Sequence, residues 1–209
     1  MTLLEIINNK ESLYQGDLRY YFKVLFFKAP NLTAPYHNFR HMLTVTAQVY
    51  NGAKYMEYDK VGKDRFRALL IAALFHDFAH SGKVGNDKLE VERAIRALYH
   101  HLHEDDTPLL SEIEGLISIT EFPHGVCDPS TAGKILRDAD MAQSFSDVWM
   151  QQILFGLAEE RGVAPIVQLQ DQINFLSNLK FYTPWGETFK EKLTNRIKEA
   201  KGFLEILQS

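Results

Sequence analysis

Apolar residues recur at helical spacing over most of this 209-residue chain. The stretch 185–207 is the clearest case, because its apolar positions repeat every three or four residues among Lys and Glu. No alternating strand pattern leads into a hairpin turn. We therefore expect a single all-α domain over residues 1–209. Its helices are predicted near residues 11–28, 37–56, 64–80, 87–103, 109–120, 130–138, 144–159, 163–180 and 185–207.

The longest uninterrupted apolar run is Ala68–Phe75. It is much shorter than the roughly 20 residues of a membrane span, so it predicts a buried helix in the core. Gly82 follows this segment and is predicted to end its helix, because glycine adopts the left-handed conformation without strain.

Composition narrows the class of protein. The chain has 23 Lys and Arg against 27 Asp and Glu, and its basic residues are scattered, which argues against a nucleic-acid-binding face. The N-terminal residues carry no secretory signal pattern. The one cysteine, Cys127, excludes an internal disulfide and is typical of a reducing compartment. We expect a cytoplasmic protein without a membrane or nucleic-acid partner.

Two histidine pairs have the same four-residue spacing. His37 and His41 form the first pair, and Asn38 between them suggests that a helix starts nearby. His76 and His80 form the second pair, at the end of the very apolar segment. On a helix, this spacing places both rings of a pair on one face.

Two aspartates add to the candidate site. Asp77 directly follows His76, and burial of these groups behind the apolar helix would be costly unless a partner such as a metal ion compensated them. Asp140 follows the apolar pair Ile135-Leu136, while the neighbouring Asp138 is predicted to face solvent.

These side chains suit a divalent metal site that activates water. Imidazole nitrogens suit zinc, iron and manganese, whereas carboxylates add hard oxygen donors and can bridge two cations. Two cations roughly 3.5–4 Å apart can stabilise both the attacking and the leaving oxygen of a phosphoryl transfer. A lone histidine pair or a His-Asp dipeptide is common by chance. The combination of all these groups, in a helical context, favours a metal site.

The pattern resembles the HD-domain superfamily of metal-dependent phosphohydrolases, which are all-helical. Residues Tyr36–His41 (YHNFRH) are similar to a signature of class I cyclic-nucleotide phosphodiesterases, and they also resemble a group of bacterial HD phosphohydrolases of about this length. Residues His76–Gly82 are similar to the second phosphodiesterase motif, with Ser81 in place of a proline. The matching motifs span residues 36–140.

The resemblance implies a role for each matching residue. His41, His76, Asp77 and Asp140 would be metal ligands, with Asp77 bridging to a second divalent ion (Zn, Mn, Mg or Fe). His37 would be the general acid that protonates the leaving oxygen.

Four further residues match positions near the second ion, where they would hold water or orient a ligand: His80, Glu90, Thr120 and Glu121. The family has aspartate where this chain has Glu121. Glu90 has an alternative interpretation as a solvated helix residue beside Arg93.

The residues that would bind the organic part of a substrate are suggested only by spacing. Class I phosphodiesterases use a glutamine and a phenylalanine one helical turn apart, and Gln172 and Phe175 have this spacing. For Phe175, a place in the hydrophobic core is the favoured interpretation. Arg40 and Lys83 could contact a phosphate or face solvent, and His124 is a weaker candidate for the rim of the site.

We therefore expect an enzyme that hydrolyses phosphate esters, with a small phosphorylated substrate such as a cyclic nucleotide. One alternative is a phosphatase of nucleoside 5′-monophosphates. Another is a non-catalytic module that senses a metal or a nucleotide.

Overall fold

The computed structural model describes residues 1–83, 85, 87–123 and 129–209. Within these ranges it contains eleven α-helices and no strand, which confirms the predicted all-α class. His124 and Cys127 lie outside the described residues. The helices are α1 (Leu3–Ile7), α2 (Arg19–Lys28), α3 (Phe39–Tyr55), α4 (Lys63–Phe75), α5 (Asp87–His101), α6 (Leu110–Ser118), α7 (Thr131–Met141), α8 (Ala158–Arg161), α9 (Pro165–Asn178), α10 (Pro184–Glu187) and α11 (Lys190–Gln208).

Four shorter or irregular helical segments connect them. Three are 3₁₀ turns: η1 (Tyr58–Val61), η2 (Glu104–Leu109) and η3 (Ala142–Phe145). The fourth, η4 (Met150–Leu157), is a π-helix that runs directly into α8. Such wide turns are rare and are often found next to functional sites.

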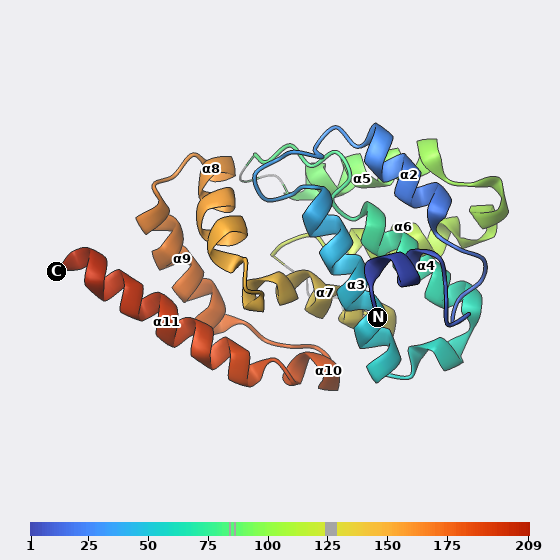
Figure 1. Cartoon of the computed structure of the whole chain (residues 1–209). Coiled ribbons are helices and arrows are strands. Elements are labelled where there is room, and N and C mark those ends of the chain that lie inside the picture. Colours follow the sequence, from blue (N-terminus) through green and yellow to red (C-terminus); the bar gives the residue numbers. More distant parts are fainter. Residues whose placement is uncertain (84, 86, 124–128) are drawn as a thin grey trace.

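Helix α4 forms the centre of the main hydrophobic core. Every residue of the run Ala68–Phe75 is fully buried, as the sequence pattern predicts for a helix that is apolar on all sides. Helices α2, α3, α5, α6 and α7 all pack against α4 (Figure 1). The end of α4 therefore lies inside the protein, where it can present polar side chains to a buried site.

A second, smaller hydrophobic cluster joins η4, α9 and α11. It contains Trp149, Leu154, Leu169, Ile173 and Ala200. These elements, orange to red in Figure 1, lie together on one side of the molecule, and α11 runs along α9. Together with α8, they bring the C-terminal part of the chain beside the N-terminal motifs.

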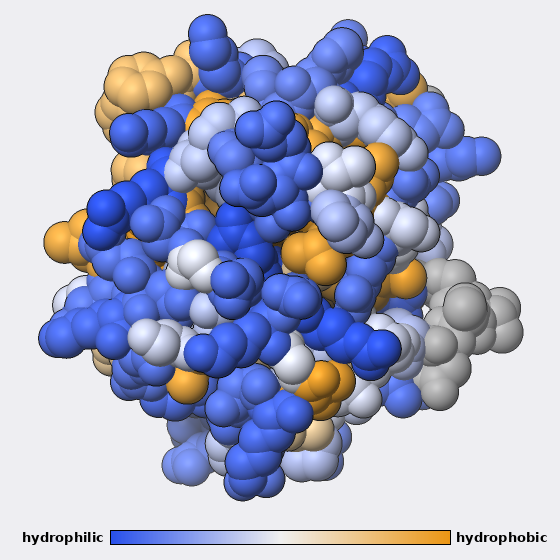
Figure 2. All heavy atoms as spheres, turned by 90° about the vertical axis from the view of Figure 1, so that its right-hand side faces the viewer, coloured by the Kyte–Doolittle hydropathy of each residue, from blue (hydrophilic) through white to orange (hydrophobic). Residues whose placement is uncertain are grey.

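Within the described residues, no helix combines the length and the hydrophobicity that a membrane crossing requires. The face shown in Figure 2 is mainly hydrophilic, and its apolar side chains form separate groups.

Candidate metal centre

The first motif sits at the start of α3. Asn38 is the N-cap of this helix, and its side-chain oxygen accepts a hydrogen bond from the backbone N–H of His41. The predicted helix start is therefore confirmed. His41 lies in the first turn, whereas His37 precedes the cap, so the prediction that both rings share one helical face is wrong.

The second motif lies in a turn beyond α4. The helix ends at Phe75, with His76 as its C-cap, and residues 76–79 form a turn. The prediction of a helix to residue 80 is thus wrong, and His76 and His80 do not share a helical face. Gly82 does adopt a positive φ of 70°, but it lies well beyond the helix end. Ala79 adopts a φ of 65°, which is unfavourable for a residue other than glycine.

Helix α7 supplies both Asp138 and Asp140. Asp140 lies near its C-terminal end and faces the histidines. The prediction that Asp138 faces solvent is wrong, because this residue is only 1% exposed. Its carboxylate accepts hydrogen bonds from the backbone N–H groups of Tyr182 and Thr183 and from the Thr183 hydroxyl. Asp138 therefore anchors the segment before α10 to the helix that carries Asp140.

Four potential donor atoms converge at the buried end of these elements. His41 Nε2 lies 3.0 Å from Asp77 Oδ2 and 3.1 Å from Asp140 Oδ1. His76 Nε2 lies 3.2 Å from Asp77 Oδ2 and 3.7 Å from Asp140 Oδ1. The two Nε2 atoms are themselves 3.2 Å apart. His41, His76 and Asp77 form a group whose ligand atoms lie close enough together to hold a metal ion.

The tautomers of both imidazoles fit this interpretation. His76 Nδ1 lies 2.8 Å from the carbonyl oxygen of Ala73, which can only accept, so Nδ1 carries the proton. His41 Nδ1 lies 2.6 Å from Gln143 Oε1 and donates to it in the same way. In the neutral imidazoles, both Nε2 atoms therefore carry the lone pair that can bind a cation, and their outer partners hold the rings in place.

Electrostatics also favour a positive charge between the four groups. Burial lowers the pKa of His41, but the hydrogen bonds to Asp140 and Asp77 and the negative charges of both carboxylates together outweigh burial and raise this pKa to about 9. Burial opposes the charge on Asp77, yet the charges and hydrogen bonds of the surrounding histidines, His76 foremost, hold the pKa of that carboxyl well below its usual range. The two carboxylates of this buried group thus need a compensating positive charge. Protons on the imidazoles can supply this charge, and a metal ion can supply it in their place.

Gln143 is an outer partner that no motif in the sequence indicates. We predict that Gln143→Leu, which removes the acceptor of His41 Nδ1 with little change in volume, weakens divalent metal binding by about 10–100-fold. Calorimetric titration of the purified variants measures this change. The matched control is Gln152→Leu, because Gln152 bonds to Gln143 and not to His41. An unchanged metal affinity in folded Gln143→Leu would show that this bond does not support the ligand.

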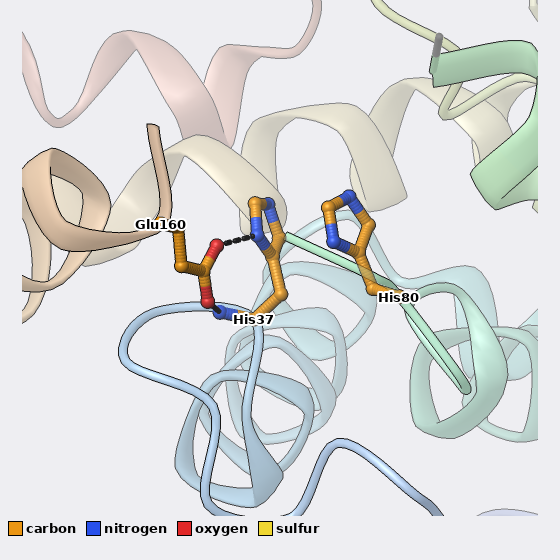
Figure 3. Close-up of side chains that lie close together, drawn as sticks. All are labelled: His37, His80 and Glu160. Atoms are coloured by element: carbon orange, nitrogen blue, oxygen red, sulfur yellow. Dashed lines mark hydrogen bonds and ion pairs between the residues drawn. The ribbon is translucent and has the colours of Figure 1, made fainter. Parts of the chain in front are cut away.

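His37, His80 and Glu160 form a second group whose ligand atoms lie close enough together to hold a metal ion (Figure 3). The rings of His37 and His80 stack, with centroids 3.6 Å apart and planes inclined by 21°. A neutral imidazole offers one nitrogen lone pair, and this lone pair lies in the ring plane. Two nearly parallel stacked rings therefore cannot both direct a lone pair at one ion in this arrangement. His80 Nδ1 also accepts the backbone N–H of Gly82 at 3.0 Å. This group is therefore better suited to proton transfer than to metal binding.

Glu160, from α8, holds the backbone and the ring of His37. Its Oε2 lies 2.6 Å from His37 Nδ1, while its Oε1 accepts from the backbone N–H groups of Tyr36 and His37. Burial raises the pKa of Glu160, but the hydrogen bond and charge of His37, together with the two backbone N–H donors, outweigh burial, and the net shift of this pKa is downward. Gly156 lets η4 approach this loop, because a Cβ there would lie only 2.5 Å from Pro35 O.

A cavity of about 560 Å³ opens beside both groups. His41, Asp77 and Asp140 line it together with His37 and Glu160. His80, Glu90, Thr120, Lys83, Gln172 and Phe175 also line it, whereas Glu121 and Arg40 are exposed and do not.

The interpretation of Glu90 as a solvated residue is wrong, because Glu90 is only 5% exposed. Its carboxylate accepts from the backbone N–H and the hydroxyl of Ser81, and it also pairs with Arg93. Glu90 thus stabilises the loop that follows His80. Thr120 donates its hydroxyl to Ile117 O at the end of α6.

Gln172 and Phe175 lie on the same cavity wall, on α9. Gln172 is buried and its Nε2 lies 3.5 Å from Ser144 Oγ. Phe175 is half-buried and its ring packs against Phe122, with centroids 6.0 Å apart. It lies in neither of the two hydrophobic clusters of the described chain, so the core interpretation is not supported.

A scan of the sequence against models of protein families finds no match, and no curated protein matches the chain. The fold and the geometry define an all-helical protein with a buried His–Asp group that could hold a metal ion.

Proposed function

We propose that the chain is a metal-dependent phosphohydrolase of the HD type that cleaves phosphate esters. One observation carries the proposal: the His–Asp group and the hydrogen-bonded His37–Glu160 pair lie on the wall of one cavity. His41, His76, Asp77 and Asp140 would hold the metal. A divalent cation bound there would supply Lewis acidity toward a phosphoryl oxygen and would lower the pKa of a bound water molecule to about 7. The resemblance of the motifs to HD phosphohydrolases supports the same class.

The protein's own contribution to bond cleavage is the proton carried by His37. Because Glu160 binds Nδ1, only Nε2 of His37 remains to exchange a proton with a ligand in the cavity. Glu160 also binds the two backbone N–H groups of this loop, which fixes where the ring lies. His37 is thus arranged to protonate a leaving alkoxide as a general acid.

The cavity also accommodates an organic group. Its volume lies within the range of about 300–1,000 Å³ for small-molecule sites. Apolar side chains of Met141, Ile153, Leu157 and Phe175 line it, with polar groups of Ser144 and Gln172 among them. Such a mixture suits a nucleobase, so a nucleotide with a phosphodiester is the favoured substrate.

An assay of the metal-loaded protein tests the proposal. The protein is reconstituted with manganese, magnesium or zinc and mixed with cyclic nucleotides, nucleoside 5′-monophosphates and bis-p-nitrophenyl phosphate. We expect metal-dependent hydrolysis, with a monoester as the product of a diester. Release of free phosphate from monophosphates alone would identify a phosphatase instead. If no substrate turns over while metal is bound, the proposed hydrolase activity is contradicted in favour of a sensing module.

A further inference from the structure

Asn31 lies between the loop that carries His37 and the turn that carries Asp77. It is 6% exposed and sits two residues after Ala29, the C-cap of α2. Neither the spacing of the motifs nor the chemistry of the metal group draws attention to this residue.

The Asn31 side chain joins the two segments through three hydrogen bonds. Its Nδ2 donates to the carbonyl oxygens of His37 at 2.6 Å and of Asp77 at 2.8 Å. Its Oδ1 accepts the backbone N–H of Ala79 at 3.0 Å. Both amide protons and the amide oxygen are therefore in use, as a buried side-chain amide requires.

The bond to Ala79 has a particular consequence for the turn. Ala79 adopts a φ of 65°, a left-handed conformation that is sterically unfavourable for an L-residue other than glycine. Surrounding contacts must hold such a residue in place, and Asn31 supplies one of them directly at the Ala79 N–H. The same amide thus sets the shape of the turn and its position relative to the His37 loop.

We infer that Asn31 is a positioning residue, which holds the general acid His37 in a fixed position relative to the turn that carries Asp77. The kinetic effect expected from this inference rests on the proposed function. Glu160 fixes His37 from the side of α8, while Asn31 fixes the same loop against the end of α4. Because a displacement of about 1 Å in a reacting group can reduce turnover by about 100-fold, loss of Asn31 is expected to impair the proton-transfer step selectively.

The kinetic test uses Asn31→Ala with a matched control, Asn9→Ala. Asn9 also makes three side-chain bonds to backbone groups, but in the N-terminal segment, with Leu13, Tyr14 and Gly16. We expect Asn31→Ala to lower kcat about 100-fold on an ester with an alkyl alcohol leaving group. It should lower kcat only a few-fold on a nitrophenyl ester, and metal affinity should stay within a few-fold of the parent. Asn9→Ala should show no such selectivity.

A double-mutant cycle with His37→Ala shows whether Asn31 acts through His37. If it does, Asn31→Ala adds no further loss on the alkyl ester in the His37→Ala background. Independent losses in the double variant, or equal losses on both esters in Asn31→Ala, would overturn the inference. If Asn31→Ala does not fold, Asn31→Asp replaces it, because this variant keeps an acceptor for Ala79 and loses both N–H donors.

A measurement without turnover separates this inference from the proposed function. The His37 Nδ1 proton donates a hydrogen bond to Glu160, and its NMR signal should shift in both Asn31→Ala and Asn31→Asp. At least in Asn31→Ala, the backbone amide proton of Ala79 should also exchange faster with solvent. Both signals should stay unchanged in Asn9→Ala. If the parent protein hydrolyses no ester, the proposed function fails, and these signals still test Asn31. Unchanged signals in the Asn31 variants would overturn its positioning role.

Discussion

Asp77→Ala is expected to abolish both metal binding and phosphoester hydrolysis. Asp77 Oδ2 lies 3.0 Å from His41 Nε2 and 3.2 Å from His76 Nε2, so its removal takes a charged oxygen donor from the centre of the group. The loss should exceed the roughly 10–100-fold effect of an outer partner. The fold should survive, because Asp77 anchors its turn through its backbone oxygen, which accepts from Asn31.

Elemental analysis after dialysis, together with calorimetric titration, measures this effect. Asp171→Ala is the matched control, since Asp171 also lines the cavity but pairs with Arg161. The control should keep its metal. Full metal occupancy in a folded Asp77→Ala variant would rule out Asp77 as a ligand.

His37→Ala is expected to keep the metal and to lose turnover on substrates with poor leaving groups. General acid catalysis contributes about 10²–10⁴-fold, and His37 lies beside the metal group without belonging to it. A nitrophenolate leaves without help from an acid, so hydrolysis of a nitrophenyl ester should change little. The slope of log kcat against the pKa of the leaving group should therefore become steeper.

Glu160→Gln provides the companion variant. It can still accept the backbone N–H groups of Tyr36 and His37, but it removes the negative charge beside His37 Nδ1. Its loss of turnover should follow the same leaving-group trend and be smaller than that of His37→Ala. Equal losses on alkyl and nitrophenyl esters in His37→Ala would contradict the role of His37 as an acid.

Short-range patterns in the sequence predicted part of the fold and of the candidate metal site. The run Ala68–Phe75 predicted a buried central helix, because apolar residues on all sides of a helix leave it no solvent-facing surface. Asn38 predicted the start of α3 because an asparagine there can bond the free N–H groups of the first turn. His41, His76, Asp77 and Asp140 were proposed together from the sequence, and the structure brings them together.

Features that depend on distant contacts could not be predicted in this way. The predicted extension of the helix to residue 80 is wrong because residues 76–79 form a turn, to which Asn31 is hydrogen-bonded. Asp138 is buried because the segment before α10 supplies its donors. Glu160 and Gln143 meet their histidine partners across more than 100 residues of sequence.

The central claim is that the His–Asp group binds a divalent cation. Anomalous diffraction from crystals soaked with Zn²⁺ tests it most directly. We predict one strong peak at bonding distance, about 2.0–2.2 Å, from the Nε2 atoms of His41 and His76 and from a carboxylate oxygen of Asp77. A map with no peak at this position, or with its strongest peak between His37 and Glu160, would contradict the claim.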